Sequence, residues 1–466
     1  MRGFLAAPLL ARRRLLASSI GVACAAALTL PLAAQGPAHA SAPRSAPAAQ
    51  ALAGSTQSLP LASLGSDRAG GAGAAAQGVL RRDVLPFSLV GVVWDNPEAE
   101  LHGRVQVRTR ARGTEAWSGW QDVETHNHDH AADPDTPEHA SKNVRGSTAP
   151  LWVGDSDGVE IRVEPESTGD RAMAAPSAPA APSDEGLLPK GLRLELVDPG
   201  EDPPPQGPEA DAPSLGDTAL TWESAASSAV NAELAPLGAS VISDLTKQQT
   251  EDDLMASRGD LTARPYIGPR PRIITRRGWG ANEKLREKNF VYTKSVKAAF
   301  VHHSASGNNY RCSQSPSVLR SIYRYHVKSS GWRDFGYNFA VDRCGNIYEG
   351  RAGGVAKPVY GAHTLGFNSN SMGIAVLGTY SNSTPPQAAL NAIARLTAWK
   401  LGMYGVNPRG KAYLKSGGSN LYKKGKLVRL NVISGHRDGF ATECPGGMLY
   451  GKLGKARQTS AHYQGR

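Results

Sequence analysis

The chain has 466 residues, of which 40% are hydrophobic and 20% charged, proportions of a globular protein that exclude a chain disordered throughout. Residues 264–466 hold 32 Lys and Arg against 7 Asp and Glu, whereas residues 1–263 hold 20 against 34. The basic C-terminal part is therefore expected to meet a polyanion; nucleic acid, anionic lipid, an anionic cell wall and a merely solubilising surface all remain open on charge alone.

The N-terminus has the pattern of an export signal. Three arginines at 12–14 precede an apolar run at 15–32, which ends near the small-x-small triplet 38–40. The adjacent arginines resemble a twin-arginine signal. We predict that residues 1–40 are removed on secretion, with a membrane anchor as the alternative. No later stretch of the sequence is long and apolar enough to span a bilayer.

Removal of the signal would leave three cysteines, Cys312, Cys344 and Cys444. An odd number in a secreted protein indicates one disulfide and one cysteine with another task. The count alone does not say which two are paired.

The N-terminal half alternates between biased and patterned segments. Residues 41–83 are rich in Ala, Gly, Ser and Pro, which predicts a flexible spacer. Residues 84–197 contain β-branched and alternating runs with several tryptophans, which predicts a small all-β domain of the sandwich type. Residues 198–263 are acidic, Pro-rich and poorly patterned, which predicts an interdomain linker.

Four histidines, His126, His128, His130 and His139, lie among acidic residues of the predicted β domain. Metal binding is one interpretation. The spacing lacks the fixed second pair that marks a zinc motif, so the pattern favours a solvated loop.

Residues 264–466 are expected to form an α/β domain, a mixed β-sheet flanked by helices. Helices are predicted at 315–328 and 385–404, the second with Thr384 as its N-cap. The predicted strands share short apolar runs and lie at 298–304, 337–341, 346–349, 371–377 and 428–434.

The first of these strands ends in His302-His303, whose side chains point to opposite faces, so only one can face a shared site. His436 follows the last strand, and Cys444 comes eight residues later in a loop with Gly and Pro. Two imidazoles and a thiolate suit tetrahedral zinc with a fourth position open to water. Such a site lowers the pKa of the water toward ~7. The spacing alone equally fits a chance grouping.

Five stretches in this region resemble, in the same order, the peptidoglycan recognition protein family, which is related to the type-2 N-acetylmuramoyl-L-alanine amidases. The first is the strand with the histidine pair, and the last contains His436 and Cys444. They cover less than half of the chain, at residues 297–305, 336–339, 347–351, 361–364 and 436–446.

The resemblance implies a role for each matching residue. His302, His436 and Cys444 match the zinc ligands. Tyr337 matches a tyrosine near the metal-bound water that assists proton transfer or stabilises the oxyanion, and Thr442 matches a residue that polarises the scissile carbonyl. Without the resemblance, the pattern favours a core position for Tyr337, a turn cap for Thr442 and a packing role for His303.

Further positions follow from the same resemblance. His363 and Asn368 match groove residues that contact the glycopeptide, and Cys312 and Cys344 match cysteines that are paired in secreted relatives. Residues 351–354 depart from the Gly-Trp pair that many animal members use to read the third stem residue. The choice between diaminopimelate and lysine stems therefore stays open.

The function implied is zinc-dependent hydrolysis of the amide between N-acetylmuramic acid and L-alanine by a secreted, monomeric bacterial enzyme. Its expected partners are peptidoglycan and, through basic residues such as Lys423, Lys424 and Lys426, anionic wall polymers, but not nucleic acid. The alternative is a peptidoglycan-binding protein without hydrolysis; such proteins typically replace the cysteine ligand with serine. A third class, a structural wall protein whose β domain does the main work, is also compatible with residues 84–197.

Overall fold

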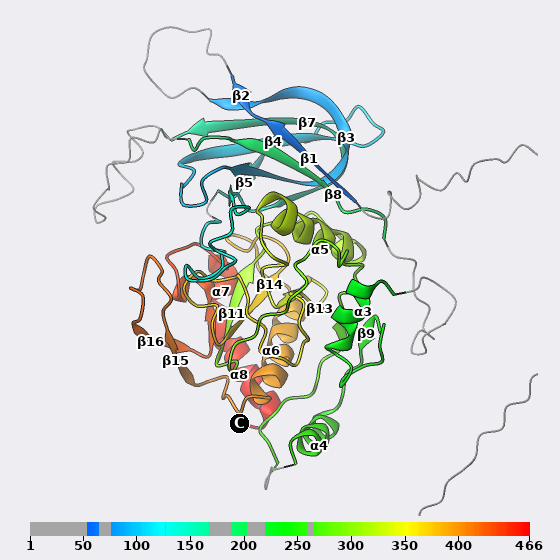
Figure 1. Ribbon diagram of the computed structural model, residues 1–466, viewed down its shortest axis with the longest axis vertical. Coiled ribbons are helices and arrows are strands. Elements are labelled where there is room, and N and C mark those ends of the chain that lie inside the picture. The colour runs from blue at the N-terminus through cyan, green and yellow to red at the C-terminus, as the bar shows by residue number, and fades with distance from the viewer. Residues whose placement is uncertain (1–53, 65–75, 126, 167–187, 203–219, 260–263) are drawn as a thin grey trace, which may run out of the picture. The chain divides into compact units, whose positions relative to one another are not determined.

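The computed structural model describes residues 54–64, 76–125, 127–166, 188–202, 220–259 and 264–466 (Figure 1). All of them belong to one contact unit that runs from Ala46 to Arg466. The predicted export signal, residues 1–40, and His126 lie outside the described residues. Among the residues that are described, no helix has the length and apolar character needed to cross a membrane.

The N-terminal region is all-β, as predicted. Its strands pair antiparallel in the order β1-β8-β3-β7-β4-β5, and β2 and β6 pair with β3. They form one connected sheet in place of two separate ones, and register shifts along β3 and β7 let these long strands bend. The strands are β1 Ser55–Pro60, β2 Ala62–Ser63, β3 Gln77–Trp94, β4 Gly103–Ala111, β5 Gln121–Val123, β6 Gly146–Ser147, β7 Leu151–Pro165 and β8 Arg193–Asp198.

The prediction of a flexible spacer at 41–83 is wrong for β1, β2 and the start of β3. The β1 segment, Ser55–Pro60, is polar and has no apolar alternation, yet all six of its residues pair with β8. The partner strand lies more than 130 residues away in the sequence. Strand formation by edge pairing to a distant segment leaves no local signal, because sheet propensity depends on the neighbouring strand.

The predicted linker at 198–263 also contains regular structure: α3 Trp222–Ala229, β9 Val241–Ile242 and α4 Lys247–Arg258. Strand β9 adds to the edge of the C-terminal sheet by pairing with β10, Ile273–Ile274. Helix α4 begins with a capping box of Thr246 and Gln249 and ends at Gly259 in the left-handed conformation. Both signals are present in the sequence, but the acidic, Pro-rich composition of the segment led to the prediction of a linker.

The C-terminal region is the predicted α/β fold. Its seven-stranded mixed sheet has the order β17-β11-β14-β12-β13-β10-β9, with parallel pairing of β17, β11, β14 and β12. Those strands are β11 Ala298–His303, β12 Phe339–Val341, β13 Ile347–Glu349, β14 Ser371–Val376 and β17 Ile433–Gly435. The helices are α5 Ser315–Arg324, continued by a π-helical turn at Tyr325–Ser329, α6 Gln387–Gly402, α7 Gly447–Tyr450 and α8 Leu453–Gln464.

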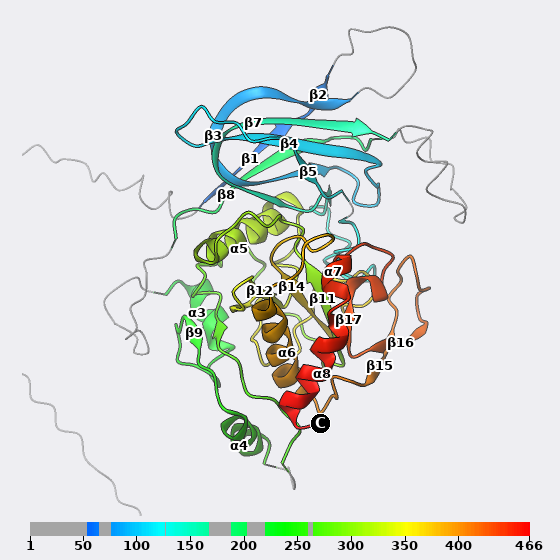
Figure 2. The same cartoon turned by 180° about the vertical axis from the view of Figure 1, so that it is seen from behind.

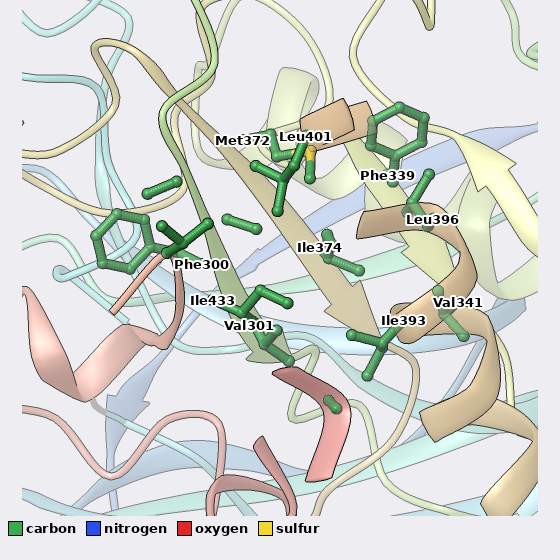
Figure 3. Packing of buried hydrophobic residues seen from close by; sticks show 14 of the residues in the cluster. Phe300, Val301, Phe339, Val341, Met372, Ile374, Ile393, Leu396, Leu401 and Ile433 are labelled. Atoms are coloured by element: carbon green, nitrogen blue, oxygen red, sulfur yellow. The ribbon is translucent and has the colours of Figure 1, made fainter. Parts of the chain in front are cut away.

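Alternation along the strands gives the sheet two apolar faces. Val341 and Ile374 pack with Ile393 of α6 in one buried cluster (Figure 3). The neighbouring residues Ala340 and Ala375 belong to a second cluster that includes the buried side of α5. Helix α8 packs beside α6 (Figure 2). The sheet is therefore covered by α6 and α8 on one face and by α5 on the other.

Two local predictions differ from the structure. Helix α6 begins at Gln387 with Pro386 as its N-cap, and no side chain caps it, so the prediction of Thr384 as N-cap is wrong. The two prolines at 385–386 disfavour helical geometry for the residue before each of them. The strand predicted at 428–434 is two strands: β16 Leu427–Asn431 forms a hairpin with β15 Lys411–Lys415, and β17 joins the main sheet.

The disulfide prediction is confirmed. Cys312, at the turn before α5, is bonded to Cys344, in the turn between β12 and β13, with their Cα atoms 6.2 Å apart. The bond ties the helix on one face to the sheet. Cys444 is buried and forms no disulfide within the described part of the chain.

Candidate metal centre

Two neighbouring parallel strands position His302 and His436. Val301 of β11 pairs with Gly435, the last residue of β17, so His302 in β11 and His436 directly after β17 lie at the same edge of the sheet. Parallel strands place their carboxyl ends together, which is where sites in such sheets form. The two imidazole rings have centroids 4.5 Å apart. Cys444 returns to this point, with its Sγ 3.8 Å from His302 Nδ1.

A fourth side chain, His130, completes the cluster from the β-rich region. Its Nε2 lies 3.7 Å from Cys444 Sγ, and one donor atom from each of the four residues lies within 4.8 Å of all the others. Tetrahedral zinc, with bonds of about 2.0–2.1 Å to nitrogen and 2.3 Å to sulfur, spaces its donors roughly 3.3–3.7 Å apart. The three-nitrogen, one-sulfur set therefore suits zinc in donor type, and the two distances from Cys444 Sγ, 3.7 Å to His130 and 3.8 Å to His302, are close to that spacing.

His436 has an environment that a metal would complete. It is fully buried, and neither ring nitrogen has a hydrogen-bond partner among the described residues. The nearest carboxylate oxygen, Asp129 Oδ2, is 3.7 Å from Nδ1. Buried polar atoms are normally paired, so an orphaned imidazole within such a donor set supports a metal ligand.

Burial sets the protonation states. It lowers the pKa of His302 well below its ordinary value, an effect reinforced by His436, and lowers the pKa of His436 to about 3. Both imidazoles are neutral at physiological pH and offer a lone pair. Burial raises the pKa of the Cys444 thiol, with Asp129 adding to the effect. A bound divalent cation would reverse that shift and release the thiol proton.

Second partners orient two of the imidazoles. Thr364 Oγ1 lies 3.4 Å from His302 Nε2, which leaves Nδ1 directed at the cluster. Asp129 Oδ1 lies 2.9 Å from His130 Nδ1, which leaves Nε2 directed at Cys444. Pairing of the outer ring nitrogen with a carboxylate or hydroxyl is the usual support of a metal-binding histidine.

Tyr337 lies beside the donor set. Its ring centroid is 5.2 Å from that of His302, and its side chain lines a small cavity together with Cys444 and Thr442. Burial raises its pKa well above the ordinary value, reinforced by Cys444. The phenol therefore stays protonated and can donate a hydrogen bond to a group bound at the metal.

Two other predicted residues have supporting positions. Thr442 Oγ1 accepts a hydrogen bond from the Cys444 amide at 3.2 Å, so Thr442 shapes the cysteine loop in addition to facing the cavity. His303 points to the opposite face of β11 from His302, and its Nδ1 accepts from the Tyr380 amide at 3.2 Å. Of the histidine pair, only His302 joins the cluster.

The predicted groove residues are enclosed. His363 and Asn368 have no exposed surface. Asn368 Oδ1 accepts from the amides of His363 and Thr364, and its Nδ2 donates to the carbonyl of Ala131 at 2.8 Å. In this conformation neither residue is open to a ligand from outside.

The prediction of a solvated histidine loop is wrong for His130, which is only 6% exposed and lies in the donor set. His128 and His139 each lie near a glutamate of the β-rich region, as the solvated interpretation allowed. The other three donors lie more than 170 residues further along the chain, so no spacing could reveal the site. The available signal was the concentration of histidines itself.

Comparison with known families matches two parts of the chain. A family model described as Rv3811 N-terminal galactose-binding domain-like matches residues 43–184. A model described as N-acetylmuramoyl-L-alanine amidase matches residues 292–447, the span that contains the cluster residues other than His130.

Individual relatives match part of the chain. Peptidoglycan-recognition protein SC2 of Drosophila melanogaster is 31% identical over 183 residues, which are 39% of this chain and 84% of that protein. Human N-acetylmuramoyl-L-alanine amidase is 30% identical over 220 residues, 46% of this chain and 31% of that protein. Among solved structures, Drosophila PGRP-LB is similar at 27% identity and a TM-score of 0.31, covering 39% of this chain and 91% of that one.

Proposed function

Because the chain belongs to the peptidoglycan recognition protein and type-2 amidase family, we propose that it hydrolyses the amide between N-acetylmuramic acid and L-alanine in peptidoglycan, with zinc as its cofactor. The observation that carries the proposal is the buried donor set around His302, His436 and Cys444. The cysteine favours hydrolysis over binding alone, because non-catalytic members typically carry serine at this position.

In the proposed mechanism, His302, His436 and Cys444 would hold the metal through two neutral imidazoles and one thiolate. Zinc held there would polarise the scissile carbonyl and would lower the pKa of a water molecule. Tyr337 donates its phenolic proton in a hydrogen bond to the carbonyl oxygen as negative charge develops there. Thr442 holds the cysteine loop in place through its bond to the Cys444 amide.

The direct test is release of L-alanine with a free amino group from purified sacculi. The protein is expected to lose activity on treatment with a chelator and to regain it when one equivalent of zinc is added. Sacculus pull-down on the same samples reports binding separately. A zinc-loaded protein that binds sacculi and releases no L-alanine, even with the metal centre opened as described below, would favour the binding alternative.

Replacement of Tyr337 with phenylalanine removes one hydroxyl from the centre. We expect kcat to fall by roughly 10²–10³-fold, because a donor aimed at the developing oxyanion is lost, while zinc content stays at the wild-type level. Tyr310→Phe is the matched control, since the Tyr310 hydroxyl is also buried but bonds to the carbonyl of Leu377, away from the donor set. An equal fall in kcat in both variants would show that the effect comes from altered packing.

The place of action is also a proposal. The Cys312–Cys344 disulfide supports an oxidising compartment outside the cytosol. The excess of basic residues in 264–466 supports attraction to anionic wall polymers. The charge of Lys424 is partly neutralised by an ion pair with Asp135 of the β-rich region.

A further inference from the structure

The segment that carries His130 crosses from the N-terminal sheet to the metal centre. Residues 127–145, called here the histidine strap, connect β5 to β6 and contain turns and bends in place of helix or strand. The Leu365 amide donates to the carbonyl of Asp129 at 3.0 Å, and the Arg145 amide donates to the carbonyl of Ser330 at 3.1 Å. The strap is thus fastened to the C-terminal region near both of its ends.

At the metal centre, the strap supplies both a ligand and its support. His130 is the fourth donor, and the adjacent Asp129 holds its outer ring nitrogen. Zinc with four protein ligands is the closed arrangement of structural sites, whereas hydrolytic sites keep one position for water or substrate. With His130 in place, a four-coordinate zinc ion would have no position left for the reacting groups.

The strap also covers the predicted groove. Asp133 Oδ1 accepts from the Gly366 amide and from Asn368 Nδ2, each at 2.8 Å, and Asp133 Oδ2 accepts from the Tyr360 hydroxyl at 2.6 Å. These bonds explain why Asn368 is enclosed. The donors that line the groove are therefore already paired to a carboxylate of the same chain.

A buried ion pair fixes the middle of the strap. Both carboxylate oxygens of Glu138 lie 2.8 Å from the guanidinium of Arg351, and the Arg333 amide donates to Glu138 at 3.2 Å. Both side chains of the ion pair are less than a tenth exposed. Bidentate geometry of this kind is directional, so it specifies where the strap sits.

We propose that the histidine strap is an intramolecular plug: His130 occupies the fourth zinc position and Asp133 and Glu138 close the groove, so that the described conformation is latent. Hydrolysis then requires the strap to withdraw. The strap has no strand or helix of its own, and it can leave without breaking the sheet pairing of β5 or β6 with their neighbours. This inference rests on the proposed amidase function.

The test uses the full chain with cobalt(II) in place of zinc as an optical probe of coordination, and azide as a small anionic ligand. In the wild type, four protein ligands should leave the visible spectrum unchanged by azide. In His130→Ala, an open position should let azide shift the spectrum. The zinc-loaded His130→Ala protein should release L-alanine at least ~10-fold faster than the wild type, and a chelator should remove its zinc faster.

Glu138→Gln is the second variant, because it loosens the strap without altering a ligand and should move both readouts in the same direction. His139→Ala is the matched control, a histidine of the same strap whose side chain faces Glu98, and it should behave as the wild type. The plug is refuted if azide shifts the wild-type spectrum and neither variant is faster. If His130→Ala binds azide and releases no L-alanine, the proposed function fails while the plug stands.

Discussion

Replacing Cys444 with serine is expected to remove bound zinc and L-alanine release together. The thiolate is the anionic member of the donor set, and a serine hydroxyl keeps its proton at neutral pH and ligates zinc poorly. We expect zinc affinity to fall by at least ~100-fold and turnover to reach background. Metal analysis and L-alanine release on the same samples measure both effects.

The same variant separates the metal from the groove. His363 and Asn368 are held by a loop and by hydrogen bonds that do not involve Cys444, so the groove should persist without zinc. Sacculus pull-down by Cys444→Ser should therefore match that of the wild type, and a thermal melt should show a folded protein. Substantial L-alanine release by this variant would contradict the zinc mechanism, and loss of pull-down would show that metal and groove fold as one unit.

Replacing Glu138 with alanine should free the strap. Removal of one partner from a buried ion pair costs about 3–5 kcal/mol, because Arg351 would be left buried without its counter-charge. Withdrawal of the strap relieves that cost, because Arg351 then reaches water. The lower stability of the closed strap should appear as faster hydrogen exchange in residues 127–145. At 1.36 kcal/mol per factor of ten, the expected acceleration at pH 7 is about 100-fold or more.

The acceleration should depend on pH with a defined sign. Burial opposes ionisation of Glu138, but Arg351 outweighs it and holds the pKa of the carboxyl below its ordinary value. A lowered carboxyl pKa stabilises the folded form above the unfolded pKa, about 4.3, and the contribution is lost as the pH falls through the folded value. After correction for intrinsic exchange rates, wild type and variant should differ at pH 6–7, and the difference should shrink as the pH falls below about 4.3 toward the lowered folded pKa. Equal exchange at pH 7 would show that the ion pair does not hold the strap.

The sequence was sufficient for three of the four donors of the metal centre. Alternation along a strand showed that only one residue of the His302-His303 pair can face a shared site. The ordered motifs then selected His302, His436 and Cys444, which the structure brings together. Those three come from one fold, in which the positions of strand ends follow from local pattern. His130 comes from another part of the chain, and its place depends on tertiary contacts such as the Glu138–Arg351 pair, which have no local signature.

The same distinction explains the errors in domain organisation. Helix α4 carried a capping box and a terminal glycine and was predictable in principle. The β1 strand was not, since it forms only by pairing with β8. Local signals identify elements that are stable through their own caps and apolar faces, whereas edge strands and the strap depend on distant partners.

Because the histidine strap and the metal centre belong to one polypeptide, the closing reaction is unimolecular. A tethered segment faces its site at an effective concentration on the order of millimolar, whatever the amount of protein present. Dilution into a large external volume, which would strip a separate inhibitor from its enzyme, leaves this balance unchanged. Activation must therefore come from something that acts on the strap itself, such as a competing ligand or a cut in its backbone.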